Sequence, residues 1–250
     1  MNLLQLKEEW LKEENAYFEG WDFSHLKDRW IDEQIPWDYK KIIQKYLNEN
    51  DRLLDMGTGG GEFLLSLKHP LSFCSVSEGY EPNVIKCEKE LIPLGVRVKK
   101  IISNEIPYED NSFNIIINRH ADYDLSEVKR VLKEDGIFIT QQIGDKNDED
   151  LILKMHLKRE TVTFDTRDLT AASQYAKRIG FHFLEGYESF TPIKFYDIGA
   201  FVYFARIISW EFVNFSVKAN FKELCALQKE VEEKGYLEGS EHRYLMVLKK

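Results

Sequence analysis

The chain has 250 residues, of which 43% are hydrophobic and 31% are charged, and its formal net charge is −9. This composition is typical of a globular protein that buries a full core, and it excludes a largely disordered chain. The excess of acidic residues opposes nonspecific attraction to a nucleic-acid backbone, so a nucleic-acid partner would need a local basic patch.

Residues 1–48 are rich in aromatic side chains and contain four of the five tryptophans. We expect this segment to form helices that cover a ligand cleft. For each single aromatic residue the alternative is ordinary packing in the core. The first predicted domain is therefore an N-terminal helical cover over residues 1–48.

From about residue 36 to residue 143, short apolar and β-branched runs alternate with helical patterns. Such repeated βα units are typical of an α/β protein with a Rossmann-like, doubly wound and mainly parallel sheet. The spacing predicts strands over 52–56, 73–77, 96–102, 113–118 and 136–143, and helices over 62–68, 82–91 and 125–132.

The second half of the chain changes in character. We predict a loop at 144–151, a helix over 167–179, a strand over 181–190 and an antiparallel final strand over 242–250. The aromatic-rich residues between these two strands include an amphipathic helix over 221–234, which predicts a C-terminal helical insertion. The predicted core therefore comprises 49–191 and 241–250, and the insertion, 192–240, would cover an acceptor pocket.

The segment LLDMGTGGGEFLL carries the strongest functional signal. A predicted strand ends at Asp55, and three glycines alternate before a helix begins near Glu62. Glycines allow a positive φ and a close approach of the backbone to a ligand, and the helix N-terminus offers unpaired N–H groups. The motif predicts a nucleotide-like ligand, and the alternative is a tight turn without a ligand.

Two acidic positions bear on the nature of that ligand. The dinucleotide pattern GxGxxG requires glycine where this chain has Glu62, which argues against a dehydrogenase that binds NAD but leaves it as an alternative. An acid at the end of the second strand normally binds ribose hydroxyls, and Glu78 has that place. Glu81 competes with it, but Glu81 precedes Pro82 and suits the start of the next helix.

Four ordered segments resemble the class I S-adenosylmethionine-dependent methyltransferase family, in particular its type 11-like domains. The family's first motif is similar to DMGTGGG, and its ribose-binding acid with the following helix is similar to EGYEPNVIKCEKEL. Its adenine-side loop and fourth strand are similar to ISNEIPYEDNSFNIIIN, and its approach to the fifth strand is similar to VKRVLKEDGIFIT. The resemblance covers roughly residues 50–143 and implies S-adenosylmethionine as the methyl donor.

The resemblance also implies roles for single residues. The three glycines would line the methionine and ribose side of the donor, Glu78 would bind the ribose, and Asn104 would lie near the adenine amino group. Asp55 would support the glycine loop. The predicted cofactor-binding residues are Asp55, Gly57, Gly59, Gly61, Glu78, Asn104 and Asn118.

The sequence motifs say less about the methyl acceptor than about the donor. A methyl sulfonium is intrinsically electrophilic, so positioning and exclusion of water can suffice for transfer. If the acceptor needs a base, His120 at the end of the fourth strand is the candidate, because an imidazole titrates near neutral pH. The alternative is that His120 pairs with Asp122 or Asp124 or caps a helix.

The aromatic covers and the acidic charge favour a small-molecule acceptor. A ribosomal RNA methyltransferase is the alternative, although we find no basic face and no zinc module. A catalytically silent S-adenosylmethionine-binding protein is a further alternative, because the fold alone does not establish turnover.

Cysteines, histidines and the N-terminus indicate the cellular setting. The three cysteines form no CxxC pair and the histidines share no ligand spacing, so we predict neither disulfides nor a metal. The N-terminus lacks the apolar core of a signal peptide, and no apolar run approaches the ~20 residues of a spanning helix. We expect a cytoplasmic protein without a membrane partner, and its oligomeric state stays open.

Overall fold

The computed structural model describes residues 2–18, 22–103, 105–158 and 168–250. Asn104, which we predicted to lie near the adenine, is outside the described residues. The chain forms two compact units. Unit 1 comprises Met1–Ile35, Lys146–Thr163 and Ser189–His242, and unit 2 comprises Pro36–Asp145, Phe164–Glu188 and Arg243–Lys250.

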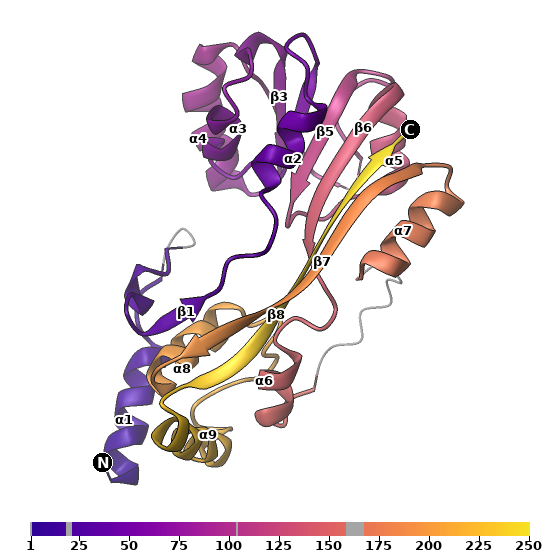
Figure 1. Ribbon diagram of the computed structural model, residues 1–250. Coiled ribbons are helices and arrows are strands. Elements are labelled where there is room, and N and C mark those ends of the chain that lie inside the picture. Colours follow the sequence, from indigo (N-terminus) through magenta and orange to yellow (C-terminus); the bar gives the residue numbers. More distant parts are fainter. Residues whose placement is uncertain (1, 19–21, 104, 159–167) are drawn as a thin grey trace. The chain divides into compact units, whose positions relative to one another are not determined.

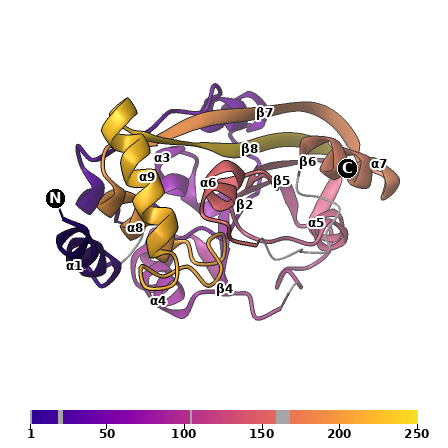
Figure 2. The ribbon, with the colours of Figure 1, turned by 90° about the horizontal axis from the view of Figure 1, so that it is seen from below.

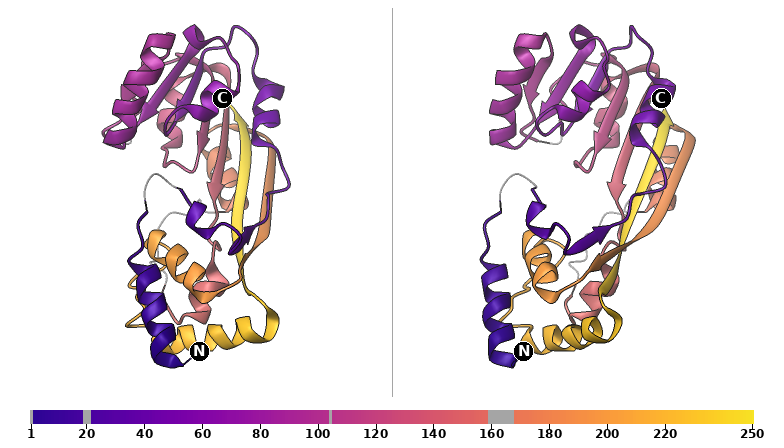
Figure 3. Two further views of the ribbon diagram at one scale, coloured as in Figure 1. Left: turned by 90° about the vertical axis from the view of Figure 1, so that its left-hand side faces the viewer. Right: turned by 60° about the vertical axis from the view of Figure 1, so that its left-hand side comes forward.

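Eight strands form one sheet in the order β1-β7-β8-β6-β5-β2-β3-β4 (Figure 1). The two longest strands, β7 and β8, are neighbours in this sheet and contribute residues to both units (Figure 3). The strands are β1 (Trp30–Asp32), β2 (Leu53–Met56), β3 (Cys74–Glu78), β4 (Arg97–Lys100), β5 (Phe113–Arg119), β6 (Leu132–Ile143), β7 (His182–Phe195) and β8 (Leu237–Lys249).

The part of the sheet in unit 2 is mainly parallel. Strand β2 pairs in parallel with β3 and β5, β3 with β4, and β5 with β6, whereas β8 runs antiparallel to β6. Strands β2 and β3 are buried along their whole length, as expected for parallel strands covered on both faces. The predicted mainly parallel, doubly wound sheet with an antiparallel final strand is confirmed.

Helices cover both faces of this parallel sheet (Figure 1). One buried cluster joins α2, α3 and α4 to Ile115 and Ile117 of β5, and the other joins α5 and α7 to Ile116, because successive strand residues point to opposite faces. Aspartates cap three of these helices through backbone N–H groups. The helices are α2 (Tyr39–Tyr46), α3 (Glu62–Ser66), α4 (Glu81–Leu91), α5 (Leu125–Val131) and α7 (Leu169–Arg178).

Unit 1 has a separate core that is rich in aromatic side chains. In α8, every residue from Ile198 to Ala205 is buried, as expected of a helix that is apolar all round. Trp10 of α1 packs against Phe221 of α9 with 5.7 Å between ring centroids. Figure 2 shows the helices α1, α8 and α9 of this unit. The helices of this unit are α1 (Leu3–Glu14), α6 (Glu149–Lys154), α8 (Ile198–Ile207) and α9 (Phe221–Lys234).

Several predicted boundaries were wrong. Strand β6 begins at Leu132 instead of residue 136, directly after α5. Strand β7 continues to Phe195, and β8 begins at Leu237, because the two strands pair well beyond the predicted hairpin. The predicted insertion 192–240 is therefore strand at both ends, and β1 interrupts the predicted helical segment 1–48. The function of these two segments as covers stays a prediction.

Three short 3₁₀ helices complete the described elements: Ser24–Leu26, Leu71–Phe73 and Ile92–Leu94. Helix α6 also begins inside the predicted loop 144–151. Among the described residues, no helix combines the length and apolarity that a bilayer crossing requires. The same residues contain no group of three or more His, Cys, Asp or Glu side chains arranged to hold a metal ion.

Candidate functional site

Polar side chains gather where the parallel strands of unit 2 end. Asp55 lies near the end of β2, Glu78 ends β3, and Asn118 is the penultimate residue of β5. The parallel register places Met56 beside both Ser77 and Asn118, so these strand ends share one edge of the sheet. All three polar residues are buried, with 5%, 7% and 0% of their surface exposed. In open α/β sheets this edge is where ligands bind.

The glycine loop follows β2 directly. Gly57, Gly59 and Gly61 all have a positive φ, the conformation that side chains disfavour. A Cβ atom at Gly57 would lie 2.3 Å from Cβ of Ala121, so this position has no room for a side chain. At Gly59, in contrast, a Cβ atom would meet no described protein atom within 4 Å. The loop therefore packs tightly at its first glycine and faces open space at its second.

Glu78 ties this loop to the end of β3. Its Oε2 accepts a hydrogen bond from Gly59 N at 2.8 Å, and its Oε1 accepts bonds from Gly79 N at 2.8 Å and Tyr80 N at 2.9 Å. Glu81, the competing acid, instead pairs with Lys100. Of the two acids, only Glu78 lines the pocket at this edge.

Asp55 is a second buried acid beside the loop. Burial raises its pKa to about 7, and the neighbouring Glu78 charge acts in the same direction. The hydroxyl of Thr58 donates to Asp55 Oδ2 at 2.7 Å and, with Arg119, opposes this shift. Two acids buried this close together destabilise the fold, and such perturbed groups concentrate at functional sites.

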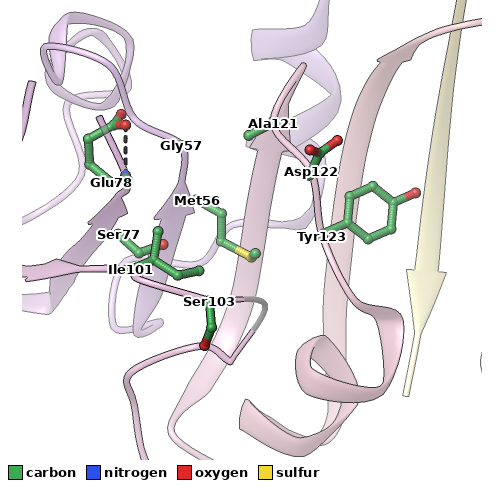
Figure 4. A pocket seen from close by; sticks show the side chains of 10 residues that line it. Met56, Gly57, Ser77, Glu78, Ile101, Ser103, Ala121, Asp122 and Tyr123 are labelled. Carbon is green, nitrogen blue, oxygen red and sulfur yellow. Dashed lines mark hydrogen bonds between the residues drawn. The ribbon is translucent and has the colours of Figure 1, made fainter. Parts of the chain in front are cut away.

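A pocket of about 220 Å³ opens between these strand ends. Figure 4 shows Glu78 on one side, Asp122 and Tyr123 on the other, and the side chains of Met56 and Ile101 between them. Ten residues line the pocket: Met56, Gly57, Ser77, Glu78, Gly79, Ile101, Ser103, Ala121, Asp122 and Tyr123.

Two of the predicted cofactor residues, Gly57 and Glu78, line this pocket, whereas Asp55, Gly59, Gly61 and Asn118 do not. Five of the lining residues that we did not predict follow the ends of β4 and β5, namely Ile101, Ser103 and residues 121–123, and the others, Met56, Ser77 and Gly79, adjoin predicted residues. The position of those five after parallel strands was the available signal, because the carboxyl ends of such strands meet at one edge.

Asn118 faces the neighbouring strand β6. Its Oδ1 accepts hydrogen bonds from Gln142 Nε2 at 2.6 Å and from the Thr140 hydroxyl at 3.3 Å. Its backbone oxygen accepts a bond from the Tyr39 hydroxyl at 2.9 Å. Its Nδ2 is buried and has no partner among the described residues. Asn118 thus joins the ends of β5 and β6 to the first turn of α2.

The predicted base, His120, follows β5 and has a positive φ of 63°. The indole N–H of Trp37 donates to Gln141 Oε1 at 2.9 Å, so the amide nitrogen of Gln141 is the atom that faces His120 Nε2, at 3.3 Å. That amide nitrogen can only donate. Nε2 of His120 therefore accepts the bond, and this network assigns the proton of the neutral ring to Nδ1.

The electrostatic surroundings keep His120 uncharged at neutral pH. Protein atoms packed around the ring lower its pKa well below the usual range, and the cationic groups of Arg243 and Arg119 act in the same direction. The residue still keeps a solvent-exposed surface. A lowered pKa together with an occupied Nε2 makes His120 a weak proton acceptor. Its role as a general base stays a prediction.

Known proteins resemble this chain in part of its sequence and in its fold. No family model matches the sequence. The chain is 32% identical over 129 residues to a ribosomal protein L11 methyltransferase of Dictyoglomus thermophilum. The match covers 46% of this chain and 39% of that protein, so the chain spans well under half of the relative's length.

Solved structures share the fold over most of the chain. A protein of Bacillus halodurans C-125 that is assigned as a methyltransferase has a TM-score of 0.57 at 17% identity, covering 85% of this chain and 98% of its own. The YcgJ protein of Bacillus subtilis has a TM-score of 0.55 at 18% identity, covering 85% and 97%. With its sheet order and its glycine loop after β2, the chain has the class I methyltransferase fold.

Proposed function

We propose that the protein is an S-adenosylmethionine-dependent methyltransferase that binds its donor at the carboxyl ends of β2, β3 and β5. The observation that carries the proposal is the pairing of Glu78 with Gly59 at 2.8 Å beside a pocket. This contact holds an acid and an open glycine turn next to each other. S-adenosylmethionine is a nucleoside with an amino-acid tail, so the acid suits its ribose and the open turn suits its tail.

The residues present fit this donor. A carboxylate has about four lone-pair sites, and three backbone N–H groups occupy three of those of Glu78. The remaining site, on Oε2, suits a ribose hydroxyl. The apolar side chains of Met56 and Ile101 line the same pocket and suit a purine face. The pocket of about 220 Å³ is smaller than the roughly 300–1,000 Å³ of typical ligand pockets, so it would hold a part of the donor.

The other predicted donor residues keep supporting functions in this proposal. Gly57 lets the loop pack against Ala121, and Asp55 holds the loop through Thr58. The open space at Gly59 leaves room for the donor's amino-acid part, and Gly61 is the N-cap residue before α3. Asn118 orders the strand ends, and Asn104 lies outside the described residues.

When bound, S-adenosylmethionine supplies an electrophilic methyl group. The chain then has to orient the acceptor and exclude water, which can contribute most of the rate enhancement. His120 would take a proton from the acceptor only if the acceptor displaces Gln141 from Nε2, because the Nε2 lone pair is already engaged by Gln141. The His120 base is therefore an optional part of the mechanism.

The proposed acceptor is a small molecule. The net charge of −9 supports this class over a nucleic acid. The name of the Dictyoglomus relative points instead to a ribosomal protein, but the match covers only 39% of that relative. Methylation of ribosomal RNA or of a ribosomal protein is the alternative that the assay must separate.

The decisive assay uses donor with a tritium-labelled methyl group and three separate acceptor pools: a small-molecule cell extract, total RNA and ribosomal proteins. We expect label in the small-molecule pool, loss of label with Glu78→Ala, and normal labelling with the neighbouring control Glu81→Ala. Label in RNA or ribosomal protein would establish the alternative acceptor. Donor binding without label in any pool would indicate a catalytically silent binding protein.

A further inference from the structure

A cationic residue and a histidine follow one another at the end of β5, in a chain whose net charge is −9. Arg119 is the last residue of β5, and the pocket residues begin two positions later at Ala121. Burial of the ring and the charge of Arg119 both lower the pKa of His120. A cation and a ring N–H donor are thus consecutive in the chain, directly before the pocket residues.

Arg119 is oriented by an aromatic ring, and its charge also acts on the buried Asp55. Its guanidinium carbon lies 4.8 Å from the ring centroid of Phe63, which itself stacks on Tyr39 at 5.3 Å. Within the described part of the chain, no salt bridge engages Arg119, and the residue is exposed. Arg29 differs, because it donates to Asp197 at 2.7 and 2.9 Å. A stacked guanidinium keeps its five N–H donors available for a planar anion.

His120 adds a neutral donor to this site. The chain of hydrogen bonds from Trp37 through Gln141 engages Nε2 and leaves the N–H on Nδ1. Because the ring is uncharged, it can donate to an anion at neutral pH without first taking up a proton. Trp37, Gln141 and His120 come from the segment before α2, from β6 and from the turn after β5, so the tertiary fold fixes the orientation of this donor.

We propose that Arg119 and His120 bind an anionic group, a carboxylate or a phosphate, on a small-molecule methyl acceptor. The inference rests on the proposed methyltransferase function and names the acceptor class. One guanidinium and one imidazole donor suit a single anionic group. Asp122, which lines the adjoining pocket, and the acidic charge of the chain oppose a long polyanion such as RNA.

The test is calorimetric and uses benzoate, phenyl phosphate and the neutral analogue benzamide. Each is titrated into the wild-type protein with and without S-adenosylhomocysteine. We expect at least one anion to bind about tenfold or more tightly than benzamide, a factor of ten being typical for one charge-assisted interaction. The tighter of the two anions then identifies the group as carboxylate or phosphate.

Variants assign the binding to the proposed residues. Arg119→Ala should lower anion affinity to that of benzamide while the affinity for S-adenosylhomocysteine stays unchanged, and Arg119→Lys should restore part of it. Arg178→Ala is the matched control, because Arg178 also stacks on a ring, that of Tyr175 at 5.1 Å, but on α7. If Arg119→Ala does not fold, Arg119→Lys and His120→Asn carry the test.

Equal binding of anions and benzamide, or anion binding that survives Arg119→Ala, would overturn the inference. Arg119-dependent binding of a single-stranded RNA oligonucleotide, with neither small anion binding, would also overturn it. Failure of the proposed function has a different signature: S-adenosylhomocysteine does not bind the wild-type protein, whatever the anions do.

Discussion

The two ends of the parallel strands in unit 2 both carry acidic residues but bury them differently. At the carboxyl ends, Asp55 and Glu78 keep less than a tenth of their surface exposed. At the amino ends, the side chains of Glu134 and Asp135 are 84% and 81% exposed and pair with Lys250 and Lys249. Both ends have a cavity, of about 220 and 200 Å³. Cavity volume therefore does not distinguish them, whereas burial of charge does.

This difference has a physical basis. A buried acid loses its hydration and destabilises the fold unless protein groups or a ligand replace it. An exposed ion pair contributes roughly 0–1 kcal/mol and implies no ligand. The carboxyl ends are thus where the chain tolerates a stability cost, and we attribute that cost to donor binding.

The largest expected effect comes from Gly57→Ala. The new Cβ would lie 2.3 Å from Cβ of Ala121, and the positive φ of 66° adds backbone strain. We expect a loss of about 2–4 kcal/mol in the free energy of urea unfolding, since a clash of this kind adds to the strain. Gly95→Ala, before β4, has a positive φ without a clash and should cost only about 1 kcal/mol.

The double variant Gly57→Ala with Ala121→Gly removes the clash and should recover part of the lost stability. Equal losses for Gly57→Ala and Gly95→Ala would contradict the close packing at the carboxyl ends.

The second prediction concerns Asp55→Asn. The folded-state pKa of Asp55 is raised to about 7 from 3.8, so the folded protein binds its proton more tightly than the unfolded chain does. Wild-type stability relative to the variant should fall as the pH rises from about 4 to about 7 and then stay level. The total fall in this relative stability between low pH and pH 7 is about 4 kcal/mol at most, because each unit of pKa difference is worth 1.36 kcal/mol.

Urea unfolding at several pH values measures this difference. Asn can still accept the Thr58 hydrogen bond, so the comparison isolates the charge. Asp135→Asn at the amino ends is the control and should show the opposite sign, because Lys249 lowers the pKa of Asp135. A pH-independent difference for Asp55→Asn would show that Asp55 is not a strained buried acid.

The third prediction separates the two roles considered for His120. As a donor to the acceptor's anion, His120 should affect binding, so His120→Asn should raise KM for the acceptor by roughly tenfold and lower kcat much less. Asn tolerates the positive φ of 63° at this position. The measurement uses the acceptor found with labelled donor. A fall in kcat of about a hundredfold at unchanged KM would instead support the general base.

The smallest effect is expected at the amino ends. Lys249→Ala removes the 2.8 Å ion pair with Asp135, which is almost fully solvated. We expect unchanged affinity for S-adenosylhomocysteine and a change in unfolding midpoint close to the experimental error. A clear loss of ligand affinity would break the distinction between the two strand ends.

The sequence predicted the parts of the fold that depend on local pattern. The buried runs that became β2, β3 and β5 and the glycine turn after β2 are local signals, and the structure has them at the predicted places. The start of β6 at Leu132 was missed, because Gly136 suggested a helix stop where the strand already runs. Tertiary pairing overrode that local signal.

The site was predictable only in part for the same reason. Glu78 and Gly57 could be placed because both belong to one local motif. The link from Trp37 through Gln141 to His120 joins residues 104 and 21 positions apart, so no local pattern reveals it. Ile101 enters the pocket through the position of β4 in the sheet, which the sequence did not specify.

The most direct test of the donor site is a calorimetric titration with S-adenosylmethionine, S-adenosylhomocysteine and NAD, on the wild-type protein, Glu78→Ala and the control Glu81→Ala. We predict that both adenosyl ligands bind the wild-type protein and Glu81→Ala, and that NAD does not bind. Glu78→Ala should weaken the affinity for both adenosyl ligands about a hundredfold or more, because it removes a buried acid that a ribose hydroxyl would contact. Binding of NAD alone, or adenosyl binding that is unaffected by Glu78→Ala, would contradict the account.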